Sequence, residues 1–226
     1  MEDQHVRDEK AVTFFDGIWK QGDYWQLESS PFEHAKYARQ AELLADRRYA
    51  RVLEIGCGAG VFTQQLAPLA DRVLALDVSP AAIDRAVAVA KAAELSRVQQ
   101  QGGTIEFRVA NVMRFDPQAE GPWDLIVLSE TIYYLGWLNS FFDVCWLAHR
   151  LFESTAHGGQ LLMTNTCGGS TGYLLLPWII RTYRDLMLNV QYDLEHEECF
   201  QGNKEGVSLE VLISLFRKEQ IAEVQE

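Results

Sequence analysis

The sequence predicts an α/β fold in which a mostly parallel β-sheet carries helices on both faces. Short, β-rich apolar runs alternate with helix-like stretches through the middle of the chain, and a glycine-rich turn follows the first of these runs. Strands that alternate with helices of this length form βαβ units, whose parallel sheet is buried on both faces. The 226 residues contain no repeat, low-complexity tract or linker, so one domain is expected.

The core elements can be placed in order along the chain. Apolar runs rich in β-forming residues predict strands at 51–55, 72–76, 104–109, 123–128 and 160–164. Helices are expected between them and after them, at 60–69, 81–95, 138–153 and 174–188. Ser79 and Pro80 fit an N-cap and first helical position for the second of these helices, and Pro177 should fall in the first turn of the last one.

The two ends of the chain differ from this core. Residues 1–45 are helix-like and aromatic, and we expect them to form an N-terminal helical lid that belongs to the same domain as residues 46–226. Residues 190–201 and 207–217 are predicted strands joined by the polar segment 202–206. They should form an antiparallel hairpin that closes the sheet as its sixth and seventh strands.

Composition narrows the range of functions. The chain has 20 Lys and Arg against 32 Asp and Glu, a net charge of −12, which disfavours nucleic-acid binding because that depends on cations that neutralise phosphates. The four cysteines lie too far apart in sequence for a Cys-x-x-Cys zinc or redox motif, so no bound metal is expected. The charged residues 1–5 are followed by no apolar segment, so no signal peptide is expected, and the apolar run 173–180 is far below the roughly 20 residues of a membrane span. A cytoplasmic protein without membrane contact is therefore expected.

A glycine loop and a distant carboxylate indicate a nucleotide site. Gly56, Gly58 and Gly60 follow the first strand, where glycine lets the backbone turn tightly and approach a ligand. Asp77 ends the next strand, 21 residues after Gly56, the separation expected for an acid that accepts hydrogen bonds from ribose hydroxyls. Val61 occupies the place of the third glycine of a dinucleotide fingerprint. NAD binding and a purely structural turn remain the alternatives.

The pattern Glu54-x-Gly56-Cys57-Gly58-x-Gly60 resembles motif I of class I S-adenosylmethionine (SAM)-dependent methyltransferases. The resemblance implies a Rossmann-like fold of seven strands, SAM as cofactor, and a methyltransferase domain over residues 46–226. Asn111 replaces the acid that these enzymes commonly carry after the third strand, but its amide can still meet the adenine amino group. The cofactor-binding residues implied are Trp25, Glu54, Gly56, Cys57, Gly58, Gly60, Phe62, Asp77, Val78, Asn111, Val112 and Ser129.

Within that superfamily the chain is similar to the NodS-type nodulation methyltransferases. Those enzymes N-methylate an amino sugar of a chitooligosaccharide, so the resemblance implies a small-molecule amine as acceptor and a role in small-molecule biosynthesis. The stretches that carry it lie within roughly residues 14–164: Tyr24–Leu27 with Ser30–Glu33, Leu53–Cys57 with Gly60–Thr63, Asp124–Val127, and Glu130–Leu135.

Three residues are candidates for catalysis. Glu130 follows the fourth strand on the crevice side and could orient an amine and relay its proton. Tyr134, next to Tyr133, could wall the acceptor pocket, and His34 in the lid is a second candidate base. An exposed strand-end carboxylate, a packing tyrosine and a surface histidine are the alternatives for these positions.

The expected function is SAM-dependent methyl transfer to a small-molecule acceptor, with an amine such as an amino-sugar nitrogen as the first choice. An O- or C-methyltransferase of an apolar natural product is the alternative suggested by the run 174–180, which could equally form a homodimer contact or ordinary helix core. An alternative of another class is a non-catalytic SAM-binding partner protein.

Overall fold

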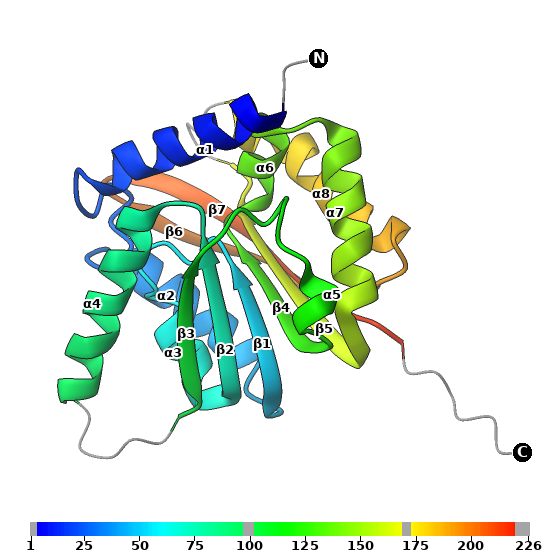
Figure 1. The fold of residues 1–226 in the computed structure, drawn as a ribbon, viewed down its shortest axis with the longest axis horizontal. Helices are drawn as coiled ribbons and strands as arrows, with labels where there is room; N and C mark the ends of the chain where they lie inside the picture. Colours follow the sequence, from blue (N-terminus) through cyan, green and yellow to red (C-terminus); the bar gives the residue numbers. More distant parts are fainter. Residues whose placement is uncertain (1–3, 97–101, 169–172, 220–226) are drawn as a thin grey trace, which may run out of the picture.

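A seven-stranded sheet with the order β3-β2-β1-β4-β5-β7-β6 forms the centre of the molecule (Figure 1). It is seen in a computed structural model that describes residues 4–96, 102–168 and 173–219. Strands β1 to β5 are parallel, and β7 runs antiparallel between β5 and β6. This confirms the predicted sheet and its C-terminal hairpin. The strands are β1 (Tyr49–Ile55), β2 (Ala70–Asp77), β3 (Thr104–Val109), β4 (Trp123–Ser129), β5 (Thr155–Thr166), β6 (Asp193–Lys204) and β7 (Val207–Arg217).

Helices cover both faces because alternate strand residues point to opposite sides. Val52 packs in a core with α2 and α3, and Ala75 packs against α4, whereas Leu53 packs in the core beneath α6, α7 and α8 (Figure 1). The helices are α1 (Gln4–Trp19), α2 (Pro31–Leu43), α3 (Thr63–Leu66), α4 (Pro80–Ser96), α5 (Pro117–Glu120), α6 (Ile132–Leu138), α7 (Phe141–Ser154) and α8 (Pro177–Asn189), with 3₁₀ turns at Ala67–Leu69 and Tyr173–Leu175.

Several predicted boundaries were wrong for local reasons. The helix expected at 60–69 shrinks to the single turn of α3, because Pro68 lacks the N–H that would continue the helical ladder. The helix expected at 138–153 begins only at Phe141, after the capping box of Ser140 and Asp143, and the separate helix α6 precedes it. The hairpin turn is the pair Glu205-Gly206 with φ of 52° and 83°, a two-residue turn shorter than the five-residue connection expected.

The two helices of the first 45 residues lie at different places on the sheet. Helix α2 packs on a face of the sheet, where Phe32 and Tyr37 are buried in its core. Helix α1 instead crosses the carboxyl edge of the parallel strands (Figure 1). Asp16 of α1 accepts hydrogen bonds from the Ser79 hydroxyl at 3.1 Å and from the Ala81 amide at 2.9 Å, at the start of α4. These bonds anchor α1 over the edge at which β1 and β2 end.

Candidate active site

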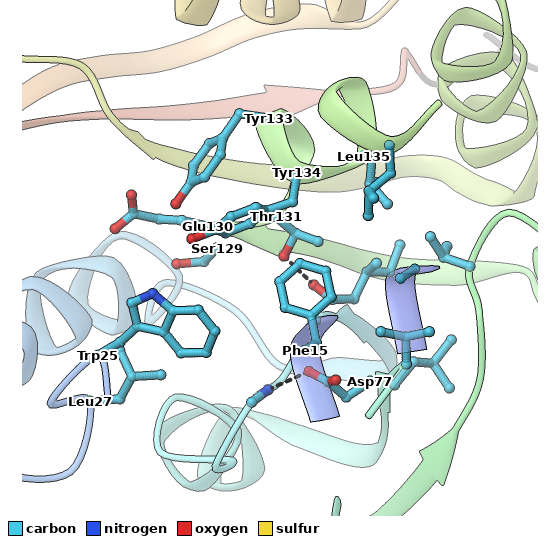
Figure 2. A pocket seen from close by; sticks show the side chains of 18 of the residues that line it. Phe15, Trp25, Leu27, Asp77, Ser129, Glu130, Thr131, Tyr133, Tyr134 and Leu135 are labelled. Carbon is cyan, nitrogen blue, oxygen red and sulfur yellow. Dashed lines mark hydrogen bonds between the residues drawn. The ribbon is translucent and has the colours of Figure 1, made fainter. Parts of the chain in front are cut away.

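A cavity of about 340 Å³ lies beneath α1 at the carboxyl ends of the strands. The strand order reverses between β1 and β4, and such a switch point is where open α/β sheets bind ligands. Asp77 lies at one end of the cavity, Glu130 and Tyr133 lie at the other, and Phe15 and Trp25 lie between them (Figure 2).

The glycine loop brings bare backbone to the first end of the cavity. Gly56 and Gly58 line it with φ of 76° and 53°, values that L side chains rarely adopt. A Cβ on Gly58 would lie 2.7 Å from the Trp19 ring, and a Cβ on Gly56 would overlap the Thr131 side chain. The loop thus forms a close-fitting cradle that a side chain would fill.

Asp77 is fixed beside this cradle by backbone donors. Its two carboxylate oxygens accept hydrogen bonds from the Gly58 amide at 3.0 Å and from the Ser79 amide at 2.9 Å. Burial raises the pKa of Asp77 to about 6, although these hydrogen bonds act in the opposite direction. A carboxylate that faces the cavity and is held by neutral donors can accept further hydrogen bonds from ligand hydroxyls, and ribose binding by Asp77 stays a prediction.

Four residues expected at the cofactor do not line the cavity. Glu54 is buried behind the loop, where the Thr63 hydroxyl donates to it at 2.5 Å and burial raises its pKa to about 8. Phe62 stacks on Tyr37 with ring centroids 5.2 Å apart. The remaining two, Cys57 and Gly60, are packed against α4. These residues shape the loop from behind, whereas Trp25, Val78, Asn111, Val112 and Ser129 line the cavity itself.

Helix α1 contacts Asn111 directly. The Asn111 amide donates to the Asp8 carboxylate of α1 at 2.8 Å, and its carbonyl oxygen accepts from the Met113 amide at 3.0 Å. Arg114 binds the other oxygen of Asp8 at 2.8 Å. Sequence reasoning placed Asn111 here but missed the carboxylate that α1 adds to this end of the cavity.

A buried network of alternating charges forms the far end of the cavity. The Lys36 ammonium lies 2.6 Å from a carboxylate oxygen of Glu33 and 2.6 Å from one of Glu130. The second oxygen of Glu33 is 2.6 Å from Lys204, and the second oxygen of Glu130 accepts from the Thr166 amide at 2.5 Å. The side chain of Lys36 is only 2% exposed.

This network fixes the protonation state of Glu130. Burial alone would raise the pKa of Glu130, but the Lys36 ammonium and the Thr166 donor outweigh it and hold the pKa below its ordinary value. For Lys36 the directions are reversed. Burial alone would lower its pKa, but the neighbouring carboxylates, Glu130 foremost, raise it. Both groups are therefore charged at neutral pH, and Glu130 is a weak base.

Aromatic rings form the wall between the two ends. Tyr134 packs against Phe15 at 5.1 Å, against Tyr133 at 4.5 Å and against Trp25 at 6.4 Å between ring centroids. The hairpin of β6 and β7 holds the loop that carries Trp25, because Lys204 donates to the Trp25 carbonyl at 2.6 Å. The Gln26 amide also donates to Glu205 at 2.6 Å.

His34 does not join the other predicted catalytic residues. It is exposed on α2, and its ring bonds the Glu28 carbonyl at 2.8 Å outside the cavity. The structure thus brings Glu130 and Tyr134 together and leaves His34 out. The pairing of Glu33 with Lys36 could have been predicted, because their opposite charges lie three residues apart on a helix. No neighbouring residue in the sequence indicates that Lys204 joins them.

Comparison with known proteins decides the family. Residues 18–141 match the family described as Nodulation protein S (NodS). The chain is 32% identical over 190 residues to nodulation protein S of Rhizobium tropici, which covers 78% of this chain and 73% of that protein. The chain belongs to the NodS family. This confirms the resemblance found in the sequence.

Solved structures agree with this assignment at the level of the fold. N-methyltransferase NodS from Bradyrhizobium japonicum WM9, in complex with S-adenosylhomocysteine, superposes with a TM-score of 0.71 at 23% identity and covers 92% of this chain and 98% of that one. The 1,6-didemethyltoxoflavin-N1-methyltransferase of Burkholderia thailandensis gives 0.69 at 14% identity, with 97% and 92% covered. The NodS-family protein is a SAM-dependent methyltransferase, as expected, and the cradle of glycines beside Asp77 fits that cofactor. No helix within the described ranges is long and apolar enough to cross a membrane.

Lys36→Met should destabilise the protein strongly at neutral pH, because it leaves the Glu130 carboxylate buried without its cation. Breaking a buried pair costs about 3–5 kcal/mol. In the wild type, the lowered pKa of Glu130 gives stability that is lost as pH falls. In the variant the pKa of Glu130 should rise, so stability should instead increase as pH falls. Urea unfolding at several pH values measures both slopes, with Lys91→Met, on the exposed side of α4, as the control. Parallel slopes would contradict the pairing.

Proposed function

We propose that this NodS-family enzyme transfers the methyl group of SAM to an amine nitrogen of a small, hydroxyl-rich acceptor, such as an amino sugar. The observation that carries the proposal is the pair of carboxylates, Glu33 and Glu130, at the end of the cavity opposite Asp77. A SAM molecule with its ribose at Asp77 would direct its sulfonium toward these carboxylates.

The cofactor would be held by the first end of the cavity. Asp77 accepts the ribose hydroxyls, Gly56 and Gly58 leave room for the chain that bears the sulfonium, and Asn111 and Val112 contact the adenine. The described lining supports this assignment, since all five residues face the cavity. The residues behind the loop, such as Glu54, act on the cofactor only by shaping the loop.

In the reaction, the lone pair of the acceptor nitrogen forms a bond to the methyl carbon while the carbon–sulfur bond breaks. Positive charge leaves the sulfur and appears on the nitrogen, and S-adenosylhomocysteine is released. Ionised Glu130 accepts a hydrogen bond from the amine and stabilises the positive charge that develops on the nitrogen. A preorganised carboxylate is well suited to this electrostatic role. Its lowered pKa makes Glu130 a poor proton acceptor, so orientation replaces the general-base role expected from the sequence.

The rest of the acceptor end suits a sugar. Trp25 and Tyr134 offer aromatic surface to the apolar face of a pyranose ring, while Lys204 and Glu33 can bond its hydroxyls. Leu175 and Leu209 also line the cavity, and the chain is 28% identical over 145 residues to the ubiquinone biosynthesis O-methyltransferase of Xylella fastidiosa. Methylation of a hydroxyl on an apolar acceptor is therefore the second candidate.

An acceptor panel tests the proposal. Transfer of labelled methyl from SAM should occur to a glucosamine oligomer with one free amine and should be absent with the fully N-acetylated oligomer, which has no nucleophilic nitrogen. A catechol serves as the probe for the second candidate. Transfer to the catechol but not to the free amine would overturn the amine assignment.

Asp77→Asn should weaken binding of S-adenosylhomocysteine at least tenfold at neutral pH, since charge-assisted hydrogen bonds contribute about 1.5–3 kcal/mol each. The wild-type affinity should be constant above the pKa of about 6 and fall as pH drops below it, because protonation removes the charge that accepts the ribose hydroxyls. The variant should lack this pH dependence. Calorimetric titration measures it, and Asp84→Asn, exposed on α4, is the control. A wild-type affinity independent of pH would contradict the role.

Glu130→Gln should lower kcat by roughly 10²-fold, the typical cost of removing one preorganised electrostatic group. Affinity for S-adenosylhomocysteine should hardly change, because Glu130 lies at the opposite end of the cavity from Asp77. The comparison uses the acceptor that passes the panel, with Glu42→Gln as a matched variant on the exposed side of α2. Equal losses of turnover and cofactor affinity would place Glu130 in the cofactor site instead.

A further inference from the structure

Three metal-ligating side chains meet on the C-terminal half of the sheet, outside the catalytic cavity. Cys167 follows β5, Cys199 lies on β6 and Glu210 lies on β7. Their sulfur atoms and a carboxylate oxygen all lie within 4.8 Å of one another. Cys199 and Glu210 are exposed and Cys167 is half-buried, so a cation from solvent can reach the group. None of the three belongs to the described lining of the cavity.

The strand register explains why these three side chains lie close together. Cys199 is opposite Leu212 on β7, and Glu210 lies two residues before Leu212, so both side chains point to the same face of the sheet. The Cys167 amide donates to the Glu210 carbonyl at 2.8 Å, which fixes Cys167 on the other side of β7. Gln201 donates to one Glu210 oxygen at 2.9 Å and orients the carboxylate.

The same register argues against a disulfide. Strand β7 separates Cys167 from Cys199, and two interstrand spacings put their Cα atoms roughly 9–10 Å apart. A disulfide requires a Cα separation of less than about 7 Å. A metal ion bonds thiolate sulfur at about 2.3 Å and carboxylate oxygen at about 2.0–2.2 Å, so it can bridge side chains that a disulfide cannot.

We propose that Cys167, Cys199 and Glu210 bind a thiophilic divalent cation such as Zn²⁺. Two sulfur ligands and one carboxylate oxygen match its preferences, and three protein ligands leave the fourth tetrahedral position to water. The ion would fasten the end of β5 to β6 across β7. Thr166, the residue before Cys167, holds Glu130 through its amide, so the ion would also stiffen the backbone behind the acceptor end of the cavity.

Titration of the fully reduced protein with Cd²⁺, the spectroscopic substitute for Zn²⁺, tests this site. A thiolate-to-cadmium charge-transfer band should saturate at one ion per chain. Cys199→Ser and Cys167→Ser should each reduce the band and weaken binding by more than tenfold, since even the loss of an outer-shell partner costs about 10–100-fold. Cys145→Ser, half-buried on α7, is the matched control and should bind as the wild type does.

A second measurement separates ligation from damage to the fold. Zn²⁺ should raise the Tm of the wild type and of Cys145→Ser but not that of Cys199→Ser, because only binding to the native state stabilises it. Cys199 is exposed, so its serine variant should keep its affinity for S-adenosylhomocysteine. Undiminished Cd²⁺ binding by Cys199→Ser, or a Cys167–Cys199 disulfide found by peptide mapping after mild oxidation, would overturn the proposal.

Discussion

The contacts of the Lys36 ammonium, buried between Glu33 and Glu130, hold together the end of the cavity opposite Asp77. Taking three charges out of water is costly, and such networks are weak contributors to net stability. The network instead fixes the relative positions of the side chains that it joins. Lys36 connects α2 to the end of β4 through Glu130, and Lys204 connects α2 to the hairpin through Glu33, so one network joins three separate parts of the fold.

The two ends of the cavity differ in the groups that line them. The end beside Asp77, where we propose that the cofactor binds, includes the backbone of Gly56 and Gly58 at positive φ, which allows a ligand to approach closely. The opposite end, which we propose for the acceptor, is lined by the charged side chains of Glu33, Lys36, Glu130 and Lys204 and by the rings of Tyr133 and Tyr134. Solved methyltransferases share the fold at 10–24% identity, among them the magnesium protoporphyrin IX methyltransferase of Synechocystis PCC 6803 and NodS.

Features that depend on residues close together in the sequence could be predicted from it. Apolar runs located β1 to β5, and the spacing from Gly56 located Asp77, because strands and loops of a parallel sheet follow one another regularly. The errors have physical causes too. Helix α6 was missed because it is a short aromatic turn whose burial is decided by α7 and α8, and His34 was favoured because its helix face cannot be read without the sheet beneath it. Lys204 comes from the far end of the chain.

That distance has a consequence for how the protein is made. Lys204 bonds the carbonyl of Trp25 across 179 residues of sequence, and Glu205 bonds Gln26 across the same span. At the roughly 5–20 residues per second of translation, the loop that carries Trp25 and Gln26 emerges roughly 10–40 s before its partner in the hairpin exists. Contacts this distant in sequence also form late, since loop closure must precede them. The two bonds that hold the Trp25 loop to the hairpin are therefore among the last contacts that the nascent chain can form.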